Sequence, residues 1–268
     1  MIDVKKIEAI IRHVSATEVM PRFNNLLRSE IREKKPGDFV TVADEASERV
    51  FTELLQDALP GSLVVGEEAV SKDISVLDKL KEDKPVWVID PIDGTYNFSH
   101  GRSKFGILIA LVQKGVTLYG WAFDAPGNRM AIAQKGEGTF LDGRRMLIDC
   151  RATDMKQLVM QGGGAQAWHF DPVRSLFKEV INYRCSLHDF MNFITGAADF
   201  LVHVNKVTPW DHAAGCLLAQ EAGAYIGLDE TGIPYDPTRF GPAFLLAAPN
   251  KEWWQKLHPV IYSDLHQT

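Results

Sequence analysis

The sequence predicts an α+β fold, a layered α/β sandwich in which helix layers alternate with sheet layers. Apolar residues recur at helical spacing near the N-terminus, over 50–58 and over 210–222. Between these helices, short apolar runs bounded by turn residues are typical of strands. The strands follow one another too closely for a regular strand-helix-strand series, so separate helix and sheet layers are expected.

The N-terminal segment predicts one or two amphipathic helices. Apolar residues keep helical spacing over 7–14 and again over 23–31, and Pro21 marks a kink or a break between the two segments. A turn at Lys35-Pro36-Gly37 precedes the next helix, which Pro60-Gly61 ends. Asp44 is expected near the first turn of that helix.

The middle of the chain predicts a sheet. Residues 63–65 and 86–89 are apolar runs that lead directly into the carboxylates of Glu67 and Asp90, as in buried strands that end at a site. An antiparallel meander is expected from the apolar runs over 106–112, 118–123, 129–133 and 139–141.

The second half mixes helices and short strands. Helices are expected over 172–181 and 210–222, strands over 224–227 and 244–247, and a C-terminal helix that buries Trp253-Trp254. Gly162-Gly163-Gly164 predicts a flexible loop and no P-loop, because no Gly-Lys-Ser/Thr follows. We expect one compact unit over 1–268, with two halves meeting near 145–160.

Composition excludes several classes of protein. With 268 residues, 46% hydrophobic and 24% charged, the chain is typical of a globular protein and not of a disordered or fibrous one. A net charge of −6 argues against nucleic acid as a partner. No apolar run reaches the roughly 20 residues of a membrane helix, and charges interrupt residues 1–20, so neither a membrane segment nor a signal peptide is expected. Three widely spaced cysteines favour reduced thiols and a cytoplasmic location.

The most informative segment is Trp87-Val88-Ile89-Asp90-Pro91-Ile92-Asp93-Gly94-Thr95. Pro91 holds Asp90 extended and Gly94 permits a turn, so the carboxylates of Asp90 and Asp93 can converge. Converging carboxylates repel unless a cation joins them, and Mg²⁺ takes a few carboxylates while leaving positions for water and phosphate. The Ile92 carbonyl is a further candidate ligand. The alternative is that both aspartates only cap the turn, worth about 1 kcal/mol.

Two further acidic elements become informative beside this one. Gly66-Glu67-Glu68 follows a strand, and Trp210-Asp211-His212-Ala213-Ala214-Gly215 opens a helix. Alone, each is equally well a charged turn or a helix-start residue. Together with the aspartates of the middle segment, the three acidic elements are a stronger signal than any one of them alone. A serine triad is not expected, because no Gly-x-Ser-x-Gly elbow is present.

The three motifs, in this order, resemble the inositol monophosphatase family, within the lithium-sensitive, magnesium-dependent phosphatase superfamily. Thr41-Val42-Ala43-Asp44 resembles the family's Thr-x-x-Asp element, and the resemblance covers roughly residues 34–250. It implies an alternating α/β sandwich, a homodimer, and hydrolysis of a small phosphorylated polyol or similar phosphomonoester with two or three Mg²⁺ ions in each active site.

The resemblance also implies roles for individual residues. Glu67, Asp90 and the Ile92 carbonyl would bind one Mg²⁺, and Asp90, Asp93 and Asp211 a second. Thr95 and Asp44 would orient and help deprotonate the attacking water, with Glu67 holding the ion that activates it and with no covalent intermediate. Substrate would contact Asp93, Asp211 and the amides of Gly94 and Thr95.

Recognition of the alcohol is where the chain departs from the family pattern. Inositol-selective relatives carry a Gly-Thr-Ala-like segment and an acidic residue before the Trp-Asp element; here these regions read Ser186-Leu187-His188-Asp189-Phe190, and His203 with Lys206. Asp189, His203 and Lys206 are candidates for the leaving-group pocket, with plain surface positions as the alternative. Inositol monophosphate is the first expected substrate. Histidinol phosphate, another polar phosphomonoester or fructose 1,6-bisphosphate are alternatives, as is a regulatory or binding protein that keeps the fold.

Overall fold

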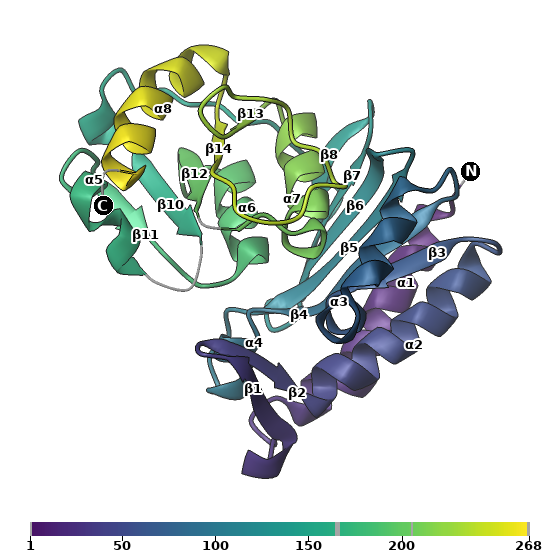
Figure 1. Ribbon diagram of the computed structural model, residues 1–268. Coiled ribbons are helices and arrows are strands. Elements are labelled where there is room, and N and C mark those ends of the chain that lie inside the picture. The colour runs from purple at the N-terminus through teal and green to yellow at the C-terminus, as the bar shows by residue number, and fades with distance from the viewer. Residues whose placement is uncertain (1, 164–166, 205, 267–268) are drawn as a thin grey trace.

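The helices and strands form a layered α/β structure, as the sequence predicts (Figure 1). The computed structural model describes residues 2–163, 167–204 and 206–266. Helices α1 (Val4–Val14) and α2 (Val42–Ala58) cover one face of a seven-stranded sheet. Helices α6 (Ser186–Thr195) and α7 (Pro209–Glu221) separate that sheet from a five-stranded one, whose outer face is covered by α8 (Lys251–His266).

The larger sheet has the strand order β3-β4-β5-β6-β7-β8-β9. Its strands are β3 (Leu63–Gly66), β4 (Val86–Asp93), β5 (Gly106–Gln113), β6 (Val116–Asp124), β7 (Arg129–Gln134), β8 (Gly138–Leu141) and β9 (Arg144–Met146). Strand β3 pairs parallel with β4, and every later strand pairs antiparallel with the one before it. The predicted meander is therefore confirmed, with β9 as an additional short strand.

The smaller sheet has the order β11-β10-β12-β14-β13. Its strands are β10 (Val159–Gly163), β11 (Glu179–Ile181), β12 (Phe200–His203), β13 (Tyr225–Leu228) and β14 (Leu245–Ala248). The chain passes from one sheet to the other between β9 and β10. One hydrophobic core contains Leu108 of the larger sheet, Leu201 of the smaller sheet and the helix layer between them.

Short elements complete the fold, all of them beside the larger sheet except α5 (Asp171–Arg174), which packs with α8 beside the smaller sheet. They are the hairpin of β1 (Ile31–Lys35) and β2 (Asp38–Thr41) and the helices α3 (Glu67–Lys72), α4 (Thr95–Ser99) and α5. In the described part of the chain, no helix combines the length and the apolar character needed to cross a membrane.

The helix predicted over 23–31 is wrong. After α1 the chain continues through a π turn (Ser15–Val19) and a 3-10 turn (Met20–Arg22) that contains Pro21. Phe23 is then extended, with φ −63° and ψ 126°, and Ile31 already begins β1. Phe23 and Leu26 nevertheless pack against the core under α1 and α2, so their spacing reflects burial by an irregular segment and not by a helix.

Two predictions for the second half are also wrong. The helix expected over 172–181 is a single turn, α5, followed by the edge strand β11, whose residues Val180 and Ile181 favour a strand. Gly162 and Gly163, expected in a flexible loop, belong to strand β10; Gly164 lies outside the described residues. A Cβ on Gly163 would lie 2.2 Å from His203 Cδ2, so glycine is required by close packing.

Helix α7, which carries Asp211, packs tightly against its neighbours through small residues. A Cβ on Gly215 would lie 2.0 Å from Cδ2 of the buried Phe190 on α6. On the other side, a Cβ on Gly120 of β6 would lie 2.9 Å from the Ala214 carbonyl oxygen. These approaches fix the position of α7 between α6 and the larger sheet.

We expect Gly215→Ala to destabilise the protein by about 1–3 kcal/mol, because the added methyl must displace the Phe190 ring. On intrinsic helix propensity alone the same change would stabilise by about 1 kcal/mol. Urea unfolding measures the change in the free energy of unfolding. Ala219→Gly in the same helix is the control, because it alters helix propensity and packing without adding a methyl group that could clash. A Gly215→Ala variant as stable as the parent would contradict this packing.

Candidate metal centre and active site

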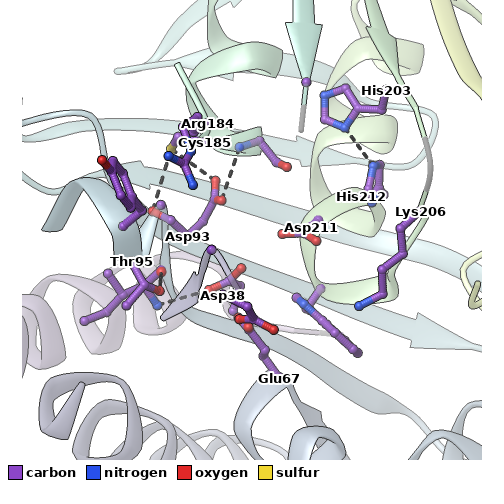
Figure 2. Close-up of a pocket in the computed structure, with 18 of the residues that line it drawn as sticks. Asp38, Glu67, Asp93, Thr95, Arg184, Cys185, His203, Lys206, Asp211 and His212 are labelled. Carbon is purple, nitrogen blue, oxygen red and sulfur yellow. Dashed lines mark hydrogen bonds between the residues drawn. The ribbon is translucent and has the colours of Figure 1, made fainter. Parts of the chain in front are cut away.

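A pocket opens where the end of β4, the start of α7 and the β1–β2 hairpin meet (Figure 2). Its lining includes the five residues that the sequence analysis gives as candidate metal ligands: Glu67, Asp90, Ile92, Asp93 and Asp211. Gly94, Thr95 and His203 line the same pocket. The predicted acidic elements, which are far apart in the sequence, therefore meet at one place.

The end of β4 shows how two aspartates three residues apart come to face one site. The β4–β5 register shifts between Asp90 and Asp93, so the strand bulges there. Gly94 then turns the chain with φ 84°, and a Cβ at this position would lie 2.8 Å from the Lys104 carbonyl oxygen. Only glycine satisfies both the left-handed backbone and this close approach.

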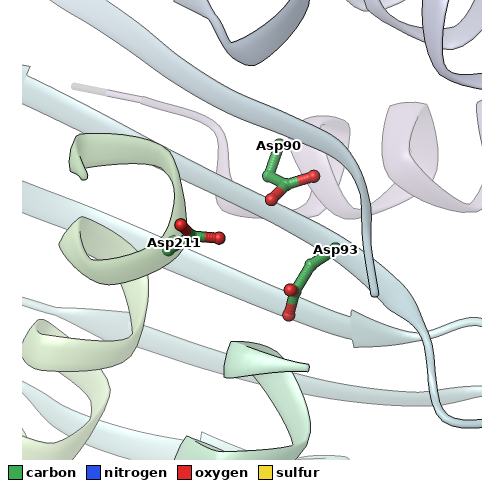
Figure 3. Close-up of side chains that lie close together, drawn as sticks. All are labelled: Asp90, Asp93 and Asp211. Atoms are coloured by element: carbon green, nitrogen blue, oxygen red, sulfur yellow. The ribbon is translucent and has the colours of Figure 1, made fainter. Parts of the chain in front are cut away.

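Asp211 completes a cluster of three carboxylates (Figure 3). One oxygen atom each of Asp90, Asp93 and Asp211 lies within 4.8 Å of the other two. Asp211 is in the first turn of α7, where Thr208 caps the helix and its Oγ1 donates a hydrogen bond to the Asp211 carboxylate. The donors are all oxygens, the type that Mg²⁺ prefers.

The ionised carboxylates of the cluster need cations to balance their charge. Burial and, after it, the charge of Asp211 raise the pKa of Asp93 to about 7, against the lowering effect of hydrogen bonds from Leu187 and Cys185. Burial also raises the pKa of Asp90 well above its usual range, with Glu67 and Asp93 adding to the rise. Buried carboxylates that repel one another are stabilised either by protons or by a divalent ion, so the residues fit the magnesium centre expected from the sequence.

Glu67 reaches the pocket from the start of α3, and Lys34 holds it there. Lys34 Nζ lies 3.0 Å from Glu67 Oε1 and 3.1 Å from Glu68 Oε1. Burial raises the pKa of Glu67 well above its usual range, and Lys34 opposes that rise. Sequence reasoning missed Lys34, because it lies on β1 in a segment where only a helix and a turn were predicted.

Thr95 and Asp44 meet beside the carboxylate cluster. Thr95 Oγ1 lies 3.0 Å from Asp44 Oδ1 and 2.9 Å from the Ile92 carbonyl oxygen. Asp44 is fully buried in the first turn of α2, where Thr41 donates hydrogen bonds from its N–H and its hydroxyl to Asp44 Oδ2. Burial raises the pKa of Asp44 to about 6, a value suited to accepting a proton near neutral pH.

The first turn of α6 holds Asp93 from the other side. Cys185 Sγ lies 3.2 Å from Asp93 Oδ2, and the N–H groups of Ser186 and Leu187 also donate to this carboxylate. A helix N-terminus stabilises such a negative charge. Sequence reasoning missed these contacts, because it named Ser186–Phe190 only for the alcohol pocket and predicted no helix there.

The three candidate residues for the leaving-group pocket, Asp189, His203 and Lys206, lie in different environments. Asp189 is fully buried, accepts a hydrogen bond from Gln161 Nε2 at 2.7 Å, and lies 3.2 Å from His203 Nε2. His203 lines the pocket, and its Nδ1 lies 2.8 Å from His212 Nε2 (Figure 2). Lys206 is at the pocket wall, its Nζ 5.5 Å from the centre of the Trp210 ring. Asp189 thus lies behind His203, while His203 and Lys206 face the pocket.

We expect the metal-free protein to lose stability as pH rises from about 5 to about 8. The folded-state pKa of Asp93, about 7, lies above the unfolded value of about 3.9, so the folded state binds more protons in this range and deprotonation favours unfolding. Bound Mg²⁺ would offset the repulsion among the deprotonated carboxylates of the cluster. Calorimetry should therefore show a larger rise of Tm on adding Mg²⁺ at pH 8 than at pH 5. Equal rises at the two pH values would contradict the role given to these carboxylates.

Cys185→Ala should weaken Mg²⁺ binding by roughly tenfold, because contacts that orient a metal ligand have effects of this size. Cys185→Ser keeps a donor to Asp93 and should bind Mg²⁺ nearly as well as the parent. Isothermal titration with Mg²⁺ measures both. Cys216→Ala, at a buried thiol on α7, is the matched control. Equal affinities for the Ala and Ser variants at 185 would show that the thiol does not position Asp93.

Comparisons with known proteins agree with this site. The family model described as "Inositol monophosphatase family" matches residues 4–268. Inositol-1-monophosphatase of Bacillus subtilis (strain 168) is 27% identical over 70% of this chain and 71% of its own length. The Nus factor SuhB of Pseudomonas aeruginosa is 30% identical over 75% of this chain and 76% of its own. The fold matches the solved structure of an IMPase from Thermotoga maritima with a TM-score of 0.80 at 22% identity, covering 98% of this chain and 96% of that one. The chain therefore belongs to the inositol monophosphatase family.

Proposed function

We propose that this protein is a magnesium-dependent phosphatase that hydrolyses a small phosphomonoester with water and without a covalent intermediate. The observation that carries the proposal is the group of Asp90, Asp93 and Asp211, whose oxygens lie within 4.8 Å of one another in a pocket that also contains Thr95. Membership of a family of phosphatases supports the same conclusion. A non-catalytic protein would have no need to keep these mutually repelling carboxylates.

In this proposal the metal ligands are those named from the sequence. Asp90, Asp93, Asp211, Glu67 and the Ile92 carbonyl would hold the ions, Asp90 being shared. Bound Mg²⁺ supplies positive charge for the phosphoryl oxygens and lowers the pKa of water. The number of ions, two or three, follows from the family resemblance.

The protein's own groups would then position water and phosphate. Thr95 Oγ1 accepts a hydrogen bond from the attacking water and passes its own proton toward Asp44 Oδ1, which lies 3.0 Å away. Asp44 serves this step in its ionised form, above a pKa of about 6. The backbone amides of Gly94 and Thr95, at the turn after β4, would donate to the phosphate.

The alcohol would lie against His203 and Lys206. Lys206 would carry the polar contact, because both ring nitrogens of His203 already have partners, Nδ1 in His212 and Nε2 in Asp189. Asp189, which accepts a hydrogen bond from Gln161, would orient the His203 ring from behind as a wall of the pocket. Inositol monophosphate is the first substrate to test, since relatives are named for it. Histidinol phosphate and fructose 1,6-bisphosphate are the alternatives, and the relative named as a Nus factor makes a binding role the candidate from another class.

Asp93→Asn should lower phosphate release at least a thousandfold, because it removes a charged ligand that any ion at the cluster would need. The assay measures release from inositol 1-phosphate, histidinol phosphate and fructose 1,6-bisphosphate, with Mg²⁺, with chelator and with added lithium. Asp149→Asn, at an exposed aspartate paired with Arg151, is the matched control and should keep parental activity. Turnover that survives in Asp93→Asn, or that does not need Mg²⁺, would overturn the proposal.

A further inference from the structure

Arg184 lies at the rim of the pocket, on the same side as Cys185 and Asp93 (Figure 2). Its guanidinium carbon lies 3.7 Å from the centre of the Tyr96 ring on α4. A Cβ on Gly37, at the turn of the β1–β2 hairpin, would lie 3.9 Å from Arg184 Nη2. The guanidinium is therefore held between two elements that both line the pocket.

The backbone around Arg184 is shaped for this placement. Arg184 has φ 56°, in the left-handed region that a residue with a side chain rarely adopts. Asn182 Oδ1 accepts a hydrogen bond from the Arg184 N–H at 3.1 Å, and Asn97 Nδ2 donates to the Tyr183 carbonyl oxygen at 2.8 Å. Strained backbone that its surroundings hold in place is characteristic of functional sites.

The charge of Arg184 has no carboxylate partner. None of the ion pairs in the described part of the chain includes it. The neighbouring Asp93 carboxylate already accepts hydrogen bonds from Cys185, Ser186 and Leu187. Half-buried guanidinium groups are normally paired with a carboxylate, whereas Arg184 has the hydroxyl of Tyr96 as a hydrogen-bond partner, so its positive charge is available to an anion.

Two further cations contact the tyrosines beside Arg184, although neither lines the pocket itself. The guanidinium carbon of Arg102 lies 5.3 Å from the centre of the Tyr96 ring, and Lys104 Nζ lies 4.9 Å from the centre of the Tyr183 ring. Neither forms an ion pair with a described residue. Of these three cations, Arg184 is therefore the one that lines the pocket, in a chain whose net charge is −6.

We propose that Arg184 is a specificity-determining residue that binds a second anionic group of the substrate, so that the preferred substrates are phosphomonoesters that carry a further phosphate or carboxylate. This inference rests on the proposed phosphatase function, whose metal cluster holds the scissile phosphate. The planar guanidinium binds either anion through two parallel N–H···O hydrogen bonds. Stacking on Tyr96 orients that fork before the substrate arrives.

The test compares two matched pairs of substrates that differ in one anionic group. Fructose 1,6-bisphosphate with fructose 1-phosphate tests a second phosphate, and 2-phosphoglycerate with glycerol 2-phosphate tests a carboxylate. For the parent enzyme we expect kcat/KM to be at least about tenfold higher for the two-anion member of a pair, as a charge-assisted bidentate contact allows. The pair with the larger ratio identifies the anion.

Three variants assign that preference to Arg184. Arg184→Gln should bring the ratio close to one, through KM and not kcat, while hydrolysis of the one-anion substrates stays within about twofold of the parent because they make no such contact. Arg184→Lys should keep part of the ratio, since it retains charge without the fork. Arg145→Gln, at a guanidinium 6.0 Å from the Phe140 ring and outside the pocket, is the matched control and should leave the ratio unchanged.

The outcomes separate this inference from the proposed function. Hydrolysis of both members of each pair at equal kcat/KM, or an Arg184→Gln variant that slows both members by the same factor, would overturn the role of Arg184 and leave the phosphatase standing. A parent enzyme that hydrolyses inositol 1-phosphate or histidinol phosphate but none of the four compounds would also overturn the role of Arg184. One that releases phosphate from none of these six compounds would overturn the phosphatase. Binding of the four paired compounds to Thr95→Ala, measured by isothermal titration with and without Arg184→Gln, then decides whether Arg184 selects the second anion.

Discussion

The repulsion among buried carboxylates is the constraint on which the rest of this structure depends. Asp90, Asp93 and Asp211 bring oxygens within 4.8 Å of one another, in surroundings that raise the pKa of the first two. No fold would keep such a group without something that balances its charge, because the interior solvates ions poorly. Lys34 balances Glu67 and Glu68 beside the cluster, and the three aspartates are left for bound cations. The bulge of β4, the left-handed Gly94 and the capped start of α7 all serve to bring these groups together.

The layered fold supplies the rigidity that this arrangement needs. Asp90 and Asp93 end a fully buried strand, and Asp211 begins a helix packed between two sheets, with Gly215 against Phe190 and Gly120 against Ala214. Around the cluster, α2 contributes Asp44 and the start of α6 contributes the donors to Asp93. Each of these groups therefore comes from the end of a regular element, where backbone geometry is well defined, while Arg184 at the pocket rim comes from a loop.

Sequence reasoning predicted the parts whose signal is local. The meander, α2, α7 and the acidic motifs follow from periodicity, turn residues and spacing, and the family resemblance placed Thr95 beside Asp44, a contact that the structure contains. It failed where tertiary packing decides: the apolar residues of 23–31 pack without a helix, and residues 179–181 join a sheet edge. Lys34, Cys185 and Arg184 were not found as site residues, because their roles depend on contacts with residues more than thirty positions away. No pattern within their own segments carries that information.

Anomalous diffraction from crystals grown with Mn²⁺ in place of Mg²⁺ tests the proposed metal centre most directly, because it locates the ions without relying on turnover. We predict at least two anomalous peaks in the pocket, with Asp90 contacting both ions, Glu67 on the first and Asp93 with Asp211 on the second. Peaks elsewhere on the protein, or an empty cluster at saturating Mn²⁺ and neutral pH, would contradict a metal-dependent active site formed by these carboxylates.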